Sequence, residues 1–114
     1  MSAETITVVT NRPKPTSKTE QNQRRQPPYH VVLLDDQDHT YEYVIEMLGK
    51  VFGYGRDKAF QMAQEVDAAG RCNVYTDSLE RAEFKRDQIH GYGADWRIPR
   101  CKGSMSAIVE PAEG

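Results

Sequence analysis

The chain has 114 residues, a hydrophobic fraction of 38% and a net charge of −2 at pH 7. This length predicts one small domain, and the mean hydropathy of −0.75 predicts that part of the chain is unstructured. No apolar run approaches the roughly 18 residues of a membrane span. The N-terminus also lacks the basic and apolar regions of a signal peptide, so we expect a cytoplasmic protein that does not bind membranes.

The charge is unevenly distributed, which argues against a nucleic-acid partner. Residues 1–28 carry five basic and two acidic side chains, and the remaining 86 residues carry ten basic and fifteen acidic ones. An acidic fold repels a phosphate backbone. The two cysteines, Cys72 and Cys101, form no CxxC motif and show no metal-ligand spacing with the three histidines. We therefore expect free thiols, no metal and no cofactor.

The first 28 residues are rich in Pro, Thr, Gln, Arg and Lys and are predicted to form a flexible N-terminal extension. A strand over Tyr29–Leu34 follows. Its apolar run Val31–Leu34 has no polar alternate position, which predicts a central strand covered on both faces. Residues 35–40 form a polar connection in which Asp38 or Thr40 can cap the next helix.

Helical spacing of apolar residues predicts a helix from Tyr41 to Phe52 that ends at Gly53. A second helix is predicted over 56–69, ending at Gly70. Its buried side is expected to consist of Ala59, Phe60, Met62, Ala63 and Val66.

A strand is predicted over 71–76, and Asp77 with Glu80 resembles a capping box that starts a third helix. Gly91 and Gly93 are expected to end that helix. A loop over 95–103 then leads to a last strand over 104–109, and a tail over 111–114 follows the domain of residues 29–110. The resulting β-α-α-β-α-β order predicts an α+β fold with three strands in one sheet and helices packed on it.

Three motifs in this order resemble those of the ClpS family, whose adaptors hand substrates to Clp-type AAA+ proteases. The family's Asn-Asp-Asp turn and following Thr-Pro-Met-Glu-Phe-Val correspond to residues 34–44, LDDQDHTYEYV. The Val-His-x-x-Gly-Lys helix end corresponds to residues 66–71, VDAAGR. The Ala-Glu-Thr-Lys stretch corresponds to residues 82–85, AEFK. The resemblance covers residues 29–109 and implies an α+β sandwich with a three-stranded antiparallel sheet and three helices. The ribosomal stalk C-terminal domain shares this fold class.

The resemblance implies a pocket that binds an N-degron, a destabilising N-terminal residue of the N-end rule. The α-amino group of that residue is largely a cation at neutral pH and is bound by carboxylate or carbonyl acceptors. The bulky side chain of the same residue requires an apolar cavity. By position, Asp35, Asp36 and Asp67 would bind the amino group. The side-chain cavity would be lined by Tyr41, Val44, Met62, Ala63, Val66 and Met105.

Three positions depart from the family pattern. Asp35 replaces the family's asparagine, Asp67 replaces its histidine, and Tyr41 replaces its gatekeeping methionine. Together the acids predict a strongly anionic site with an altered side-chain preference, in which like charges can raise the pKa of one acid. Taken alone, Asp35 and Asp36 are also typical of helix-capping and loop acids.

The resemblance further implies that Glu80 and Lys85 dock on the N-terminal domain of a Clp AAA+ unfoldase. Without the family context, such a pair is typical of a solvated helix face. We expect a monomeric adaptor and not an enzyme, because the sequence contains no recognisable nucleophile motif and no Gly-rich phosphate loop. An adaptor that docks on the unfoldase but no longer reads N-termini is the alternative.

Overall fold

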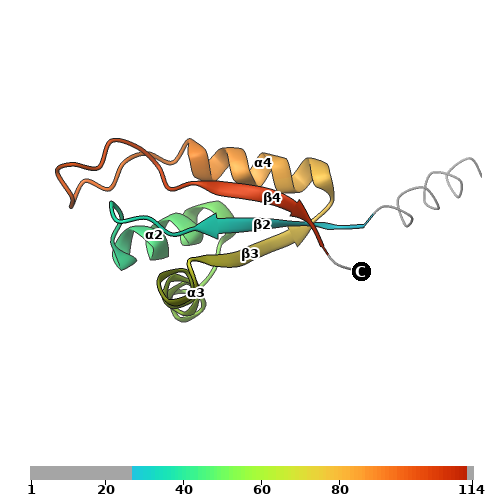
Figure 1. Ribbon diagram of the computed structural model, residues 1–114, viewed down its shortest axis with the longest axis horizontal. Helices are drawn as coiled ribbons and strands as arrows, with labels where there is room; N and C mark the ends of the chain where they lie inside the picture. The colour runs from blue at the N-terminus through green and yellow to red at the C-terminus, as the bar shows by residue number, and fades with distance from the viewer. Residues whose placement is uncertain (1–26, 113–114) are drawn as a thin grey trace, which may run out of the picture.

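The computed structural model describes residues 27–112, and the elements in that range follow the predicted β-α-α-β-α-β order (Figure 1). The elements are β2 (Tyr29–Leu34), α2 (Tyr41–Phe52), α3 (Arg56–Ala69), β3 (Arg71–Asp77), α4 (Leu79–His90) and β4 (Ala107–Pro111). Most of the predicted N-terminal extension lies outside the described residues, as do residues 113–114 of the predicted tail.

Strand β2 is the centre of a three-stranded sheet of order β3-β2-β4, as its continuous apolar run predicts. Both pairings are antiparallel, with Val31 opposite Tyr75 of β3 and Val109 of β4. The register on β3 shifts between Val31 and Val32, where a bulge interrupts the pairing. The α+β fold with a three-stranded antiparallel sheet and three helices is therefore confirmed.

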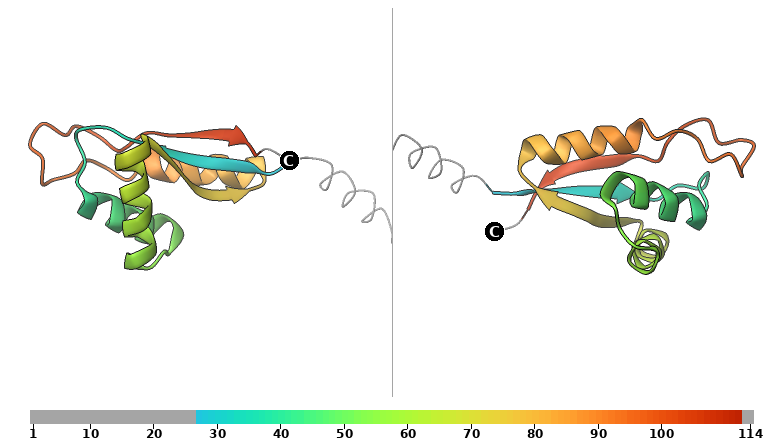
Figure 2. Two further views of the ribbon diagram at one scale, coloured as in Figure 1. Left: turned by 60° about the horizontal axis from the view of Figure 1, so that its bottom comes forward. Right: turned by 180° about the vertical axis from the view of Figure 1, so that it is seen from behind.

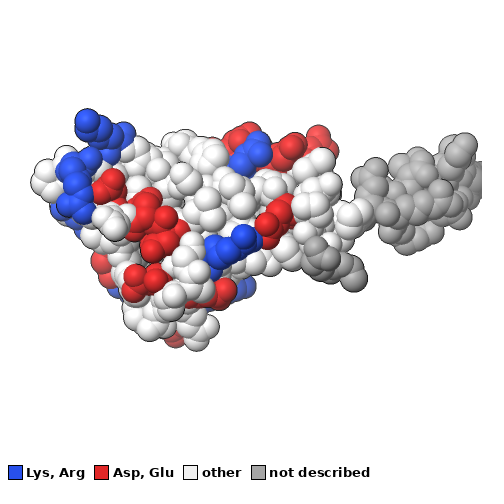
Figure 3. Space-filling view, viewed as in Figure 1, with Lys and Arg blue, Asp and Glu red and all other residues white. Residues whose placement is uncertain are grey.

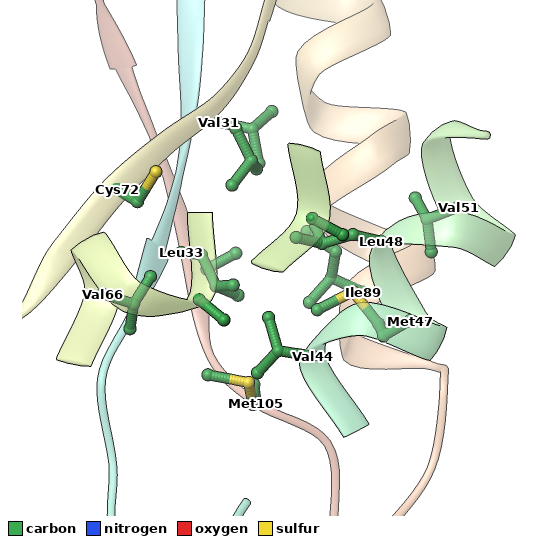
Figure 4. Packing of buried hydrophobic residues seen from close by; sticks show 14 of the residues in the cluster. Val31, Leu33, Val44, Met47, Leu48, Val51, Val66, Cys72, Ile89 and Met105 are labelled. Carbon is green, nitrogen blue, oxygen red and sulfur yellow. The ribbon is translucent and has the colours of Figure 1, made fainter. Parts of the chain in front are cut away.

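The helices lie on one face of the sheet, and the core fills the space between the two layers (Figure 2). From β2, Val31 and Leu33 point into this core and are fully buried. From α2, Met47 and Leu48 meet them, and Ile89 of α4 completes the contact (Figure 4). Alternation along the strand and helical spacing along α2 thus place the two apolar faces against each other.

Among residues 27–112, no helix lies on the other face of the sheet (Figures 1 and 2). Val32 is only 1% exposed, and it pairs with Asn73 and Ile108 on either side. Arg71 and Glu110, which form an ion pair, belong to the flanking strands. The prediction that both faces of β2 are covered is confirmed for Val31–Leu33, although side chains alone provide the second cover.

Helix termini follow the sequence with one exception. Thr40 caps α2 by accepting a hydrogen bond from Tyr43 N, and Gly53 ends the helix with a left-handed φ of 77°. The predicted capping box at α4 is wrong, because Ser78 is the N-cap and accepts from Arg81 N. Asp77 is still in β3, where its carboxylate accepts from the hydroxyl of Tyr75.

The last strand begins three residues later than predicted. Strand β4 spans Ala107–Pro111, so Met105 lies before it and Pro111 belongs to the strand instead of the tail. Residues 104–106 are held by other bonds, since Ser104 Oγ accepts from Gly93 N and the Ser106 carbonyl accepts from Leu34 N. Phe60 also departs from its predicted burial, because it is 41% exposed and its ring meets Tyr41 edge-on.

Candidate functional site

A small pocket lies where β2 ends, α2 begins and α3 ends. Its cavity volume is about 60 Å³. We refer to residues 35–40 as the β2–α2 turn and to residues 91–106 as the α4–β4 loop. The pocket is lined by Asp35, Asp36, His39, Thr40, Tyr41, Val44, Ala63, Val66, Asp67 and Met105.

A backbone hydrogen bond brings the carboxylates of the turn and of α3 to the same pocket. Asp35 N donates to the carbonyl of Gly70 at 3.0 Å, and Gly70 N donates to the carbonyl of Val66 at 2.8 Å. Gly70 has a left-handed φ of 85°, which glycine adopts without strain. The β2–α2 turn is therefore joined to the last turn of α3, where Asp67 lies.

Tyr41 lies at the rim and is paired with Asp67. Its hydroxyl donates to Asp67 Oδ2 at 2.8 Å, and the residue is 37% exposed. The hydrogen bond to Asp67 raises the pKa of Tyr41, with smaller contributions from burial and from the charges of Asp67 and Asp35. The Tyr41 hydroxyl thus already occupies one oxygen of Asp67, one of the three acids of the pocket.

Beneath the carboxylates, the pocket wall is apolar. Val44, Ala63, Val66 and Met105 are all at most 5% exposed. Met105 lies beside Val44 at the edge of the core (Figure 4). An acidic rim above a small apolar floor can bind a cation and an adjacent apolar group at the same time.

A buried carboxylate holds the turn against the α4–β4 loop. Asp95 is 1% exposed, and its Oδ2 accepts from both the amide and the hydroxyl of Thr40 at 2.8 Å. Its Oδ1 accepts from Arg97 N and Arg97 Nη1. Burial by itself would raise the pKa of Asp95, but these hydrogen bonds outweigh it and lower the pKa to about 2.

Arginines join the same loop to the turn and to α2. Arg100 donates to Asp38 Oδ1 at 2.6 Å and to the Gln37 carbonyl at 2.7 Å, and Arg97 donates to Glu46 at 2.7 Å. Figure 3 shows basic side chains gathered at the projecting end of this loop with acidic ones beside them. The loop is thus part of the pocket wall, positioned through charged hydrogen bonds.

The structure brings together eight of the nine predicted pocket residues. Met62 is the exception: it is half-buried and packs against the core but does not line the pocket. Met62 lies one turn before Val66 on the same side of α3 and one position further than Ala63 from the end of the helix at the pocket. Sequence reasoning missed His39 and Thr40 as lining residues. For His39, the available signal was its position three residues after Asp36.

The predicted docking pair lies on α4, away from the pocket lining. Glu80 is exposed in the first turn of α4. Lys85 is half-buried, since its Nζ donates to the Val51 carbonyl at 2.7 Å and lies 5.5 Å from the ring centroid of Phe52. Phe84 next to it is 62% exposed. Lys85 therefore also stabilises the C-terminal end of α2.

Residues 27–112 contain neither a metal-binding cluster nor a membrane-spanning helix. In that range no group of three or more His, Cys, Asp or Glu side chains is arranged to hold a metal ion. No helix described there has the length and apolar character needed to cross a membrane.

Comparisons with known proteins agree on one family. A family model described as ATP-dependent Clp protease adaptor protein ClpS matches residues 24–97. The ClpS adapter protein of Pectobacterium carotovorum is 36% identical over 83 residues, which cover 69% of this chain and 76% of the relative. The corresponding protein of Streptomyces coelicolor is 32% identical over 66 residues, or 58% of this chain and 69% of the relative.

A solved structure shows the same fold. Agrobacterium tumefaciens ClpS2 bound to L-phenylalaninamide superposes with a TM-score of 0.66 at 24% identity. The match covers 77% of this chain and all of that chain.

Proposed function

The chain belongs to the ClpS family of non-catalytic adaptors for the ATP-dependent Clp protease, and we propose that it selects substrates by their free N-terminus. In this proposal a monomer in the cytoplasm binds the first residue of an N-degron substrate. It then delivers that substrate to a Clp AAA+ unfoldase for degradation. The observation that carries the proposal is the acidic rim placed directly above an apolar floor.

The chemistry of an N-terminal residue matches these two parts. An α-amino group has a pKa near 7.7 to 8.0, so it is mostly protonated at neutral pH. Asp35, Asp36 and Asp67 surround the cavity with carboxylates that can accept its three N–H bonds. The first side chain would enter between Val44, Ala63, Val66 and Met105. L-phenylalaninamide, the ligand of the Agrobacterium protein, carries both a free amino group and an apolar side chain.

The decisive experiment compares peptides that differ only at the N-terminus. Fluorescent peptides beginning with Phe or Leu are titrated against their N-acetylated twins, and we expect binding of the free amine only. Equal binding of both, or binding of neither, would overturn the proposal. Asp67→Asn should lower the affinity for the peptide with a free N-terminus at least tenfold. Asp57→Asn, the same change at an exposed position outside the pocket on α3, should leave the affinity unchanged.

We also propose that the exposed face of α4 docks on the N-terminal domain of the unfoldase through Glu80 and Lys85. Glu80→Lys and Lys85→Glu should each abolish binding of that domain. Lys102→Glu, a charge reversal in the α4–β4 loop, should not. Because Lys85 also bonds the Val51 carbonyl, the fold of its variant is checked by thermal unfolding. Unchanged docking in the Glu80→Lys variant would contradict the proposal.

One observation favours a second candidate function, an adaptor that docks on the unfoldase without reading N-termini. The Tyr41 hydroxyl already bonds Asp67 across the rim, so an incoming amino group must share that carboxylate. If this bond excludes substrates, the chain binds the unfoldase while free and acetylated peptides both fail to bind. Measuring unfoldase docking and peptide binding on one preparation separates the two functions.

A further inference from the structure

His39 is the most enclosed polar side chain of the pocket wall. Its side chain is 4% exposed, although it lies in the β2–α2 turn. Nδ1 lies 2.8 and 2.9 Å from the two carboxylate oxygens of Asp36. Nε2 lies 2.8 Å from the carbonyl oxygen of Gly103. The imidazole therefore bridges the β2–α2 turn and the α4–β4 loop.

Each ring nitrogen has an oxygen at 2.8 Å that only accepts hydrogen bonds, and Nε2 also has the Cys101 thiol at 3.3 Å. A carboxylate and a backbone carbonyl have no hydrogen to offer, and a neutral imidazole has only one N–H. Contacts of 2.8 Å from each nitrogen to oxygen are hydrogen-bond distances that require a hydrogen on both nitrogens. An imidazolium, which has two N–H donors and a positive charge, fits both of these contacts.

The other groups around the ring are compatible with this charge. Cys101 Sγ lies 3.3 Å from Nε2 and donates its own hydrogen to the Gly103 carbonyl. It also accepts from Asp95 N at 3.2 Å. The ring of Tyr43 packs on the imidazole at a centroid distance of 4.5 Å. Among these contacts of the ring, Asp36 is the charged side chain, and its negative charge is opposite to that of an imidazolium.

The position of this ion pair bears on both parts of the pocket. Asp36 and Met105 line the cavity, and Gly103 precedes Met105 by two residues. The contacts of His39 therefore join an acid of the rim to the loop that carries Met105, one of the four apolar residues of the floor. Asp36 also accepts from Asp38 N at 2.9 Å, so its carboxylate is already engaged on the turn side. Asp35 has no comparable partner of opposite charge among the described contacts.

We propose that His39 is a positioning residue of the pocket: as an imidazolium it neutralises Asp36 and fixes the Met105-bearing loop, which leaves Asp35 and Asp67 to receive the substrate's amino group. This inference rests on the proposed N-terminal recognition. It divides the three acids into one structural carboxylate and two binding ones. It also gives the pocket a smaller negative charge than its acids alone suggest.

The charge on His39 is tested first, without any peptide. Nitrogen-detected NMR of the full chain at about pH 7 should show both ring nitrogens of His39 protonated. The Asp36→Asn variant keeps an oxygen for Asp38 N but removes the counter-charge, so its His39 ring should become neutral. A neutral ring in the wild-type chain would overturn the inference, whatever the peptides do.

Peptide binding then tests the division of roles. Asp35→Asn should lower the affinity for a peptide with a free N-terminal Phe more than tenfold. Asp36→Asn and His39→Gln should each lower this affinity about threefold. The double variant Asp36→Asn/His39→Gln should be no weaker than either single one, because both changes break the same pair. An Asp36→Asn loss as large as that of Asp35→Asn, or additive losses in the double variant, would overturn the inference. If wild-type chain binds acetylated and free peptides equally, the proposed function fails while the NMR result still stands.

Discussion

The two ends of the domain are held together by different forces. Where helices cover the sheet, β2 and α2 meet through fully buried apolar side chains such as Leu33 and Leu48. At the pocket, the β2–α2 turn and the α4–β4 loop meet through Asp95, His39 and Arg100. Apolar burial depends little on pH, whereas hydrogen bonds made by titratable side chains change with protonation. The pocket end should therefore respond to conditions that leave the core intact.

Removing apolar volume from the core should have the largest effect on stability. Leu48→Ala is expected to lower the free energy of unfolding by about 2–5 kcal/mol, because it leaves a cavity in a fully buried contact. Leu79→Ala is the matched control: that leucine is 41% exposed, so its loss should stay within about 0.5 kcal/mol. Urea unfolding measures both variants. Similar losses at the two leucines would contradict the division between core and surface.

Removing the buried carboxylate should have a smaller effect, confined to the pocket end. Asp95→Ala breaks bonds to Thr40 and Arg97 and should lower the free energy of unfolding by about 2–3 kcal/mol. Hydrogen exchange should speed up at the first turn of α2 more than in β2. The control is Asp87→Ala, whose carboxylate is 66% exposed beside Arg86, with an expected loss below about 1 kcal/mol. Uniform acceleration across β2 would refute a local role.

Acid should remove the contribution of the same carboxylate in wild-type protein. The pKa of Asp95 is about 2 in the folded chain, below the ordinary value of 3.8 for an aspartate, so ionised Asp95 stabilises the fold above about pH 4. This contribution of about 2 kcal/mol is lost as the pH falls towards about 2. The difference in unfolding free energy between wild type and Asp95→Asn should therefore shrink over that range. The hydrogen bond from Tyr75 is the main cause that lowers the pKa of Asp77. Protonation of Asp77 changes the unfolding free energy of both proteins equally, so it cancels in the difference. A constant difference would disprove the effect.

The smallest change should appear in binding and not in stability. Tyr41→Phe keeps the ring at the rim but frees Asp67 from a hydroxyl that donates to it at 2.8 Å. We expect peptides with a free N-terminus to bind about 2–5 times more tightly, since a surface bond of this kind contributes at most about 1 kcal/mol. Tyr75→Phe removes an equivalent 2.8 Å bond to Asp77 outside the pocket and should not alter affinity. Weaker binding to the Tyr41→Phe variant would show that the hydroxyl contacts the substrate.

The core end was largely predictable from the sequence. The apolar run Val31–Leu34 predicted the central strand, and glycines at 53 and 70 predicted where α2 and α3 end. These signals are local, because burial and helix termination leave a pattern within a few residues. The error at the N-cap of α4 also arises locally, because Ser78 and Asp77 are neighbours and both are good caps.

The pocket end was predictable only as far as its acids and its apolar lining. The bond between Asp95 and Thr40 joins residues 55 positions apart, and the contact of His39 with Gly103 spans 64 positions. No spacing rule links such pairs. From the sequence, Asp95 is therefore an ordinary loop acid. In the structure it is buried and bonds Thr40, the N-cap of α2.

The glycine at the end of α3 has a consequence for redesign of the domain. Gly70 joins the turn of Asp35 to the segment of Asp67 through backbone atoms alone, so the backbone spacing of these two residues does not depend on their side chains. If the proposed function holds, residue 67 can therefore be exchanged, for instance for histidine, without a change in the backbone that carries it. Gly70 itself offers no such freedom, because its φ of 85° strains any other residue. A panel of adaptors with different N-terminal preferences could thus be built on one unchanged backbone.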